Sequence, residues 1–182
     1  SKLSDPEYPA EEYCYTDAIS DHAEKFIREH PAEKPFLLYV AYTAAHWPMH
    51  ARSDEIAKYR GRYAAGYAGV REARYAKMLE QGVVSSAITT LWPFPSDLGE
   101  QGRFWPWDER NMEVYAAMVE CMDRGIGRIR QTLAETGRLD NTVIFYLQDN
   151  GGCAETRGRE GEGGGRGAGP SLPPLSEEAV RI

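Results

Sequence analysis

Phe36-Leu37-Leu38-Tyr39-Val40-Ala41-Tyr42-Thr43 is the stretch that decides the expected fold, because it is an almost unbroken apolar run of strand length. A run without polar alternation is typical of a strand buried on both faces of a sheet. Residues 142–147 form a second run of the same kind. With helical patterns before and between the two runs, the chain predicts an α/β fold with a mostly parallel sheet flanked by helices.

Four segments around these runs have helical periodicity: residues 16–29, 53–63, 66–81 and 108–136. Thr16 is the expected N-cap of the first segment, and Gly137 is the expected end of the last. The last segment carries an apolar stripe that we expect to face the core, formed by Tyr115, Val119, Met122, Ile126, Ile129 and Leu133. Gly125 and Gly127 interrupt it, which predicts close approach of another backbone.

Composition excludes several classes of protein. The chain has 182 residues and a net charge of −7, and no block of Lys or Arg that would form a nucleic-acid footprint. No apolar run reaches the roughly 20 residues needed to span a membrane. The first residues lack the order of a secretory signal, which predicts a mature or internal start. Three widely spaced cysteines (Cys14, Cys121, Cys153) predict neither a disulfide framework nor a cysteine zinc site.

The composition changes near residue 155. Half of the 18 glycines fall between Gly151 and Gly169, followed by three prolines. We therefore expect part of a folded domain over residues 1–155 and a Gly/Pro-rich flexible or incomplete segment over residues 156–182. The Trp- and Pro-rich stretch at residues 92–107 predicts an ordered excursion lying over the domain.

Polar residues follow each apolar run, where ligands of parallel sheets bind. His46 follows the first, and Asp149 and Asn150 follow the second. Adjacent carboxylate and amide oxygens suit Ca²⁺ or Mg²⁺, although Asn150-Gly151 is also a favoured hairpin turn. His46 can donate to an anion or act as a general acid, or be an ordinary loop residue. Pro48 disfavours the helix that would align His46 and His50 on zinc.

Three segments together resemble a known family: residues 34–50, with Thr43-Ala44-Ala45-His46-Trp47-Pro48; residues 115–123; and residues 137–155, with Asp149-Asn150-Gly151-Gly152. Their order and spacing are similar to those of the type I, formylglycine-dependent sulfatases, the arylsulfatase family. The resemblance covers about residues 15–155. It implies an alkaline-phosphatase-like α/β fold, of which this chain would be a central part.

The resemblance also implies a chemistry. Members hydrolyse sulfate esters with a formylglycine hydrate as nucleophile and one divalent cation, usually Ca²⁺. By position, Asp149 and Asn150 resemble the strand-end pair that ligates the cation, and His46 resembles the histidine that contacts sulfate. Substrates range from aryl sulfates to sulfated sugars, and the family suggests a periplasmic, secreted or lysosomal location.

Two family features have no counterpart in the sequence. The nucleophile motif, Cys-x-Pro/Ala-x-Arg, precedes the His46 loop in the family, so we expect it upstream of this chain. Cys153 and Arg157 have the right separation, but Glu155 occupies the proline or alanine position. The lysine that holds sulfate far beyond the Asp-Asn pair is also absent.

We therefore expect the isolated chain to be inactive, and its unpaired sheet edges to promote self-association. Two alternatives stay open at this point. One is a phosphoesterase of the same superfold, with a Ser or Thr nucleophile. The other is a non-catalytic remnant that binds a sulfated ligand or a protein partner.

Overall fold

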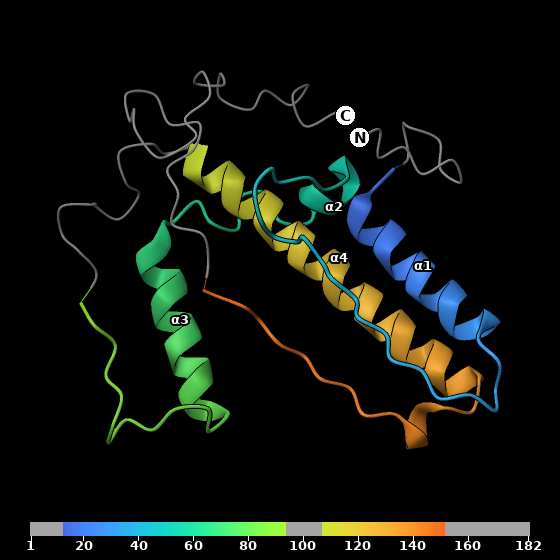
Figure 1. The fold of residues 1–182 in the computed structure, drawn as a ribbon. Helices are drawn as coiled ribbons and strands as arrows, with labels where there is room; N and C mark the ends of the chain where they lie inside the picture. Colours follow the sequence, from blue (N-terminus) through green and yellow to red (C-terminus); the bar gives the residue numbers. More distant parts are fainter. Residues whose placement is uncertain (1–12, 94–106, 152–182) are drawn as a thin grey trace.

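The described part of the chain is a helical assembly (Figure 1). The computed structural model describes residues 13–93 and 107–151. In order, its elements are α1 (Tyr15–Glu29), α2 (Ser53–Ala57), α3 (Tyr67–Glu80), α4 (Trp107–Glu135) and the 3₁₀ helix η2 (Leu139–Asn141). None of these helices is long and apolar enough to cross a membrane.

Periodicity predicted the two main helices well. α1 begins one residue before the expected start, so Thr16 lies within the helix and Cys14 occupies the N-cap. α4 spans the expected range, and its end is set by Gly137, whose positive φ of 69° is easily adopted only without a side chain. The helix expected over 53–63 is shorter, because regular α-helix ends at Ala57 and turns follow.

The predicted sheet is not present, and the assignment of a mostly parallel α/β sheet is wrong for the described residues. The runs at 36–43 and 142–147 are extended, but no backbone hydrogen bond pairs residues 36–42 or 143–147 with any described segment. Their side chains are largely in solvent, as Leu37 (98% exposed) and Phe145 (79% exposed) show. An apolar sequence favours an extended chain, but a sheet forms only where a neighbouring strand takes up the backbone groups.

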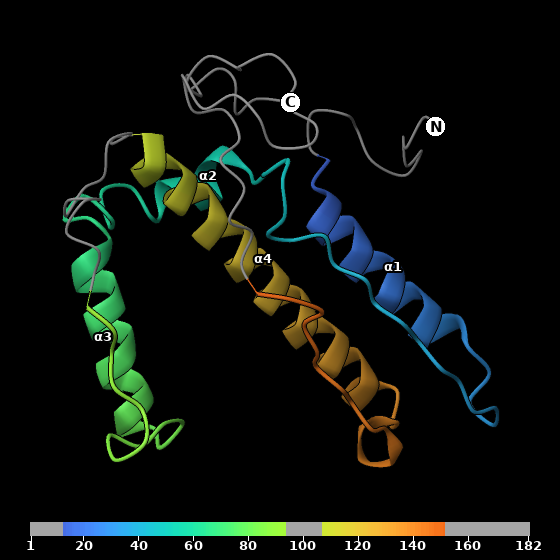
Figure 2. The same ribbon diagram turned by 60° about the vertical axis from the view of Figure 1, so that its left-hand side comes forward.

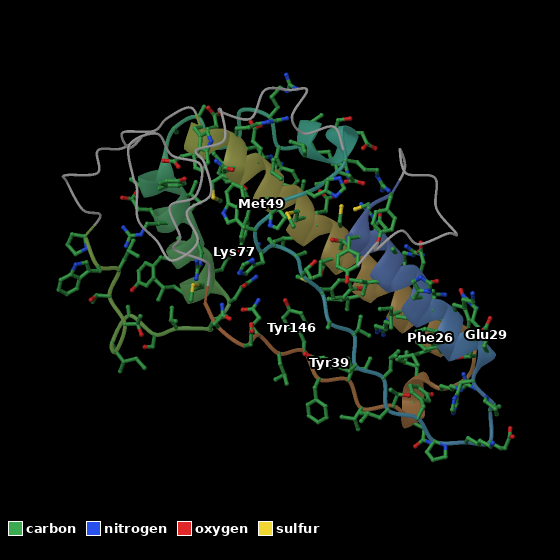
Figure 3. The ribbon with its side chains drawn as sticks, turned by 45° about the horizontal axis from the view of Figure 1, so that its top comes forward. Phe26, Glu29, Tyr39, Met49, Lys77 and Tyr146 are labelled. Carbon is green, nitrogen blue, oxygen red and sulfur yellow. The ribbon has the colours of Figure 1, made fainter. Side chains whose placement is uncertain are left out.

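The two runs nevertheless share a direction. In Figures 1 and 2 both travel along α4 from the end that carries η2 toward the end where α4 begins. Figure 3 marks Tyr39 on the first run and Tyr146 on the second. The segments that carry His46 and Asp149 therefore both follow runs that head toward the same end of α4.

α1 and α4 lie side by side in both ribbon views and form the main packing contact (Figures 1 and 2). Gly125 of α4 meets Ser20 of α1 so closely that an added Cβ would lie 2.1 Å from the Ser20 hydroxyl oxygen. That hydroxyl also lies 2.8 Å from the Tyr42 hydroxyl, in hydrogen-bond contact. The expected close approach at Gly125 is thus real, although side chains make it, whereas an added Cβ at Gly127 would have no atom within 4 Å.

The buried face of α4 differs from the predicted one. Of the expected stripe only Leu133 is buried, and Tyr115 and Val119 are more than a third exposed. The buried apolar side chains of α4 are Val114, Ala117, Met118, Cys121 and Leu133. Both faces of α4 are apolar. The buried face carries small residues, among them Ala117, Cys121 and Gly125, which allow α1 and the segment around α2 to approach.

A compact core lies where α2 and the segment before it pack on the first half of α4. Its buried members are Ala51, Ile56, Val114, Ala117 and Met118. Ala44, Ala45, Met49 and Tyr59 pack against this core from its edge. The loop that carries His46 therefore packs directly on α4.

Candidate functional site

Ion pairs fix the start of α1 to α2 and α4. Arg52 pairs with Asp17 at 2.6 Å, and Arg124 pairs with Glu55 at 2.8 Å. Burial alone would raise the pKa of Glu55, but hydrogen bonds from Lys58 and Arg124 outweigh it and lower that pKa below its ordinary value. These contacts hold the segment that follows the His46 loop in place.

His46 is exposed at the centre of the loop after the first extended run. Its Nδ1 lies 2.7 Å from the backbone carbonyl oxygen of Trp47. A carbonyl oxygen only accepts, so Nδ1–H is the donor and Nε2 is the ring nitrogen left for another partner. In this exposed side chain Nε2 is therefore the ring nitrogen that is left to bind a further partner.

The side chain of Trp47 contacts the first residue of α4. Its ring stacks on that of Trp107, the first residue of α4, with 6.1 Å between ring centroids and 11° between planes. Figure 3 shows the labelled Met49, two residues later, beside α4. No local sequence pattern links Trp47 with Trp107, 60 residues away, and only the Trp-rich character of the region between 92 and 107 hinted at an aromatic contact.

His50 ends the same loop and is half-buried. Burial lowers its pKa, and the nearby Arg52 guanidinium lowers it further. His50 is therefore an unfavourable place for a positive charge.

Asp149 and Asn150 lie in the exposed segment that ends the second extended run. The Asn150 amide nitrogen donates to the Gly151 carbonyl oxygen at 2.7 Å, which leaves its amide oxygen available as an acceptor. No hydrogen bond or ion pair joins His46 to either residue within the described ranges. The assignment of Asp149 and Asn150 to a cation site, and of His46 to sulfate binding, stays a prediction.

The described residues hold no group of three or more His, Cys, Asp or Glu side chains placed to bind a metal. An open hollow on α1 does not include the predicted site residues either. It is lined by Asp21, Glu24, Lys25, Arg28, Glu29 and Arg128. Arg128 of α4 pairs there with Asp21 and, at 2.6 Å, with Glu24 of α1, so these ion pairs join α1 to α4.

The two described cysteines are buried free thiols. Burial, reinforced by the Glu55 carboxylate, raises the pKa of Cys121 to about 11, and burial also raises the pKa of Cys14. A thiol of this kind is a poor nucleophile at neutral pH. Cys153, the residue with the misleading motif spacing, lies outside the described residues, as does the segment 156–182.

The sulfatase family model matches residues 1–172, nearly the whole chain. The chain belongs to the sulfatase family. An uncharacterized sulfatase of Schizosaccharomyces pombe is 36% identical over 143 residues, which are 71% of this chain and 24% of that protein. The arylsulfatase of Klebsiella aerogenes is 31% identical over 147 residues, which are 78% of this chain and 31% of that enzyme.

Mouse arylsulfatase J is also similar, with 26% identity over 137 residues, 75% of this chain and 15% of that protein. The sulfatase chain described here thus spans less than a third of the length of the curated relatives it matches. Membership of the family confirms the resemblance drawn from the His46 and Asp149 segments.

Proposed function

We propose that the intact protein hydrolyses sulfate esters, and that this chain supplies the histidine that binds sulfate and two ligands of a divalent cation. The observation that carries the proposal is the sulfatase match over residues 1–172, which includes every residue to which we assign a role. The exposed position of His46 and of the Asp149 segment supports it, because substrate must reach both.

His46 is suited to an anionic substrate by its hydrogen bonding. Because Nδ1–H donates to the Trp47 carbonyl, Nε2 is the nitrogen left to contact a substrate. In the protonated ring, Nε2–H donates to a sulfate oxygen or to the bridging ester oxygen. As sulfur bonds to an attacking nucleophile and its bond to the ester oxygen breaks, the same proton would pass to the departing alcohol oxygen, so that a neutral alcohol leaves and His46 becomes neutral.

Asp149 and Asn150 fit part of a cation site. Both offer hard oxygen donors. The Asn150 amide nitrogen donates a hydrogen bond to the Gly151 carbonyl, which leaves the amide oxygen to bind a cation. Two residues do not fill the six to eight positions of Ca²⁺, or the six of Mg²⁺. Other ligands would come from beyond the described residues. A bound cation would neutralise negative charge on the sulfate oxygens.

The nucleophile is a separate matter. Cys14 and Cys121 are both buried, and neither is followed by the Pro/Ala and Arg of the family motif. We therefore place the formylglycine of the intact protein outside the described residues. We assign the role of nucleophile to no described residue.

The substrate class that we propose is an aryl sulfate or a sulfated sugar. The similarity to the K. aerogenes arylsulfatase supports the first of these, since that relative is named for aryl sulfate esters. Turnover of 4-nitrophenyl sulfate by the intact protein, with 4-nitrophenyl phosphate as the competing substrate, tests the class. Preference for the phosphate ester would overturn the proposal in favour of a phosphoesterase.

Calcium titration of the intact protein tests the metal ligands. Asp149→Ala should weaken calcium binding at least 10-fold, because the cation site loses a charged ligand, whereas Asp140→Ala, an exposed aspartate of η2, serves as the matched control. Equal calcium affinity in the two variants would remove Asp149 from the site and favour a non-catalytic remnant.

A further inference from the structure

The loop of His46 is attached to α4 on both sides of the histidine. On one side, Ala44 and Ala45 pack against the core formed with Val114, Ala117 and Met118 of α4. On the other, Met49 packs against the same core. Between these contacts His46 is exposed, so the ring itself is not held by packing.

A further contact between the loop and α4 is aromatic. Trp47 stacks almost parallel on Trp107, with 6.1 Å between centroids. Trp107 opens α4, and its own carbonyl accepts a hydrogen bond from the Asn111 side chain at 2.8 Å, which ties the first turn of the helix together. The Trp107 ring is therefore carried by a first turn that this side-chain hydrogen bond closes.

We infer that Trp107 is a positioning residue for His46, acting through the stacked ring of Trp47. The inference rests on the proposed function for its meaning in catalysis. The stack fixes residue 47, whose carbonyl oxygen accepts the His46 Nδ1–H bond at 2.7 Å. Fixing that carbonyl holds the proton on Nδ1 and leaves Nε2 as the nitrogen that can bind another partner.

A purely structural stack would have a different effect. It would add buried aromatic area and stability, and its loss would leave the protonation pattern of the His46 ring unchanged. A positioning stack sets which ring nitrogen carries the proton. The discriminating measurement is therefore the tautomer of His46 and does not require enzymatic activity.

The experiment is nitrogen-15 NMR of the histidine ring nitrogens in the 182-residue chain, at a pH where the imidazole is neutral. The native chain should show Nδ1 of His46 as the protonated nitrogen. Trp107→Leu, which keeps apolar bulk but removes the ring, should give signals averaged between the two tautomers. Trp107→Phe should retain the native pattern, because a ring remains to stack.

Two more variants complete the test. Trp47→Leu removes the partner ring and should reproduce the averaging. Trp92→Ala is the matched control, since this tryptophan is 80% exposed and its carbonyl, which accepts from Arg71, is unaltered. A native tautomer in either leucine variant, averaging in the phenylalanine variant, or an equal change in the control would overturn the inference.

The result separates this inference from the proposed function. If the intact protein fails to hydrolyse sulfate esters while the leucine variants still lose the tautomer, the stack positions His46 and the function is wrong. If hydrolysis is found and the tautomer is unaffected, the function stands and the positioning role of Trp107 falls.

Discussion

Replacement of Gly125 by alanine tests the contact between α1 and α4 on which the described fold depends. A Cβ at this position would lie 2.1 Å from the Ser20 hydroxyl oxygen and 2.8 Å from the Tyr42 hydroxyl oxygen. Both distances are shorter than any normal contact, so the helices must separate or the Ser20–Tyr42 hydrogen bond must break. The residue affected next is Tyr42, four positions before His46.

The magnitude follows from three contributions. Overpacking a close contact costs about 1–3 kcal/mol, and loss of the Ser20–Tyr42 hydrogen bond costs about 1 kcal/mol. Alanine in place of glycine within a helix returns about 1 kcal/mol. Gly125→Ala should therefore lower the free energy of unfolding by about 1–3 kcal/mol.

Gly127→Ala is the matched control, because this glycine lies in the same helix with no atom within 4 Å of an added Cβ. It should raise the free energy of unfolding by about 1 kcal/mol. Urea denaturation followed by circular dichroism measures both variants, and adding Ser20→Ala to Gly125→Ala should recover part of the loss. Equal stabilisation by both alanines would refute the α1–α4 packing described above.

Two further predictions concern charge and exposed backbone. Despite the burial of Glu55, hydrogen bonds from Lys58 and Arg124 lower its pKa in the folded chain. The ionised Glu55 therefore stabilises the fold at pH values above the ordinary pKa of 4.5, and this stabilisation is lost as the pH falls through the lower pKa of the folded state. Glu55→Gln should flatten this acid dependence in urea titrations, and an unchanged pH profile would contradict it. The chain should also self-associate through its extended runs, which pair with no described segment. The sedimentation mass should therefore rise with concentration, and Leu37→Lys with Phe145→Lys should reverse this rise. A sharp monomer at every concentration would exclude it.

The sequence allowed the helices to be predicted because their information is local. The apolar spacing of α1 and α4, and Gly137 at the end of α4, need no knowledge of distant residues. The choice between the two apolar faces of α4 depended on Gly125, which leaves room for the Ser20 side chain only where the two helices meet. That information is tertiary, and the periodicity pointed to the wrong face.

The pairing of strands in a sheet and the contacts within the site also depend on tertiary information. An apolar run specifies an extended chain, but pairing depends on a neighbour that no local pattern reveals, so the runs at 36–43 and 142–147 were wrongly assigned as strands. The residue types of His46 and Asp149 were recognisable from the family motif. Their hydrogen bonds, and the stack of Trp47 on Trp107, required the structure.

The most direct test of the central claim is the rate of 4-nitrophenyl sulfate hydrolysis by the intact protein carrying His46→Gln. We predict a fall in kcat/KM of about 100-fold or more, since loss of a general acid typically costs about 10²–10⁴-fold. His22→Gln, on α1, should leave kcat/KM unchanged, because the His22 ring stacks on Phe26 of the same helix. Equal kcat/KM for native protein and His46→Gln would contradict the assignment of His46 to the sulfate ester site.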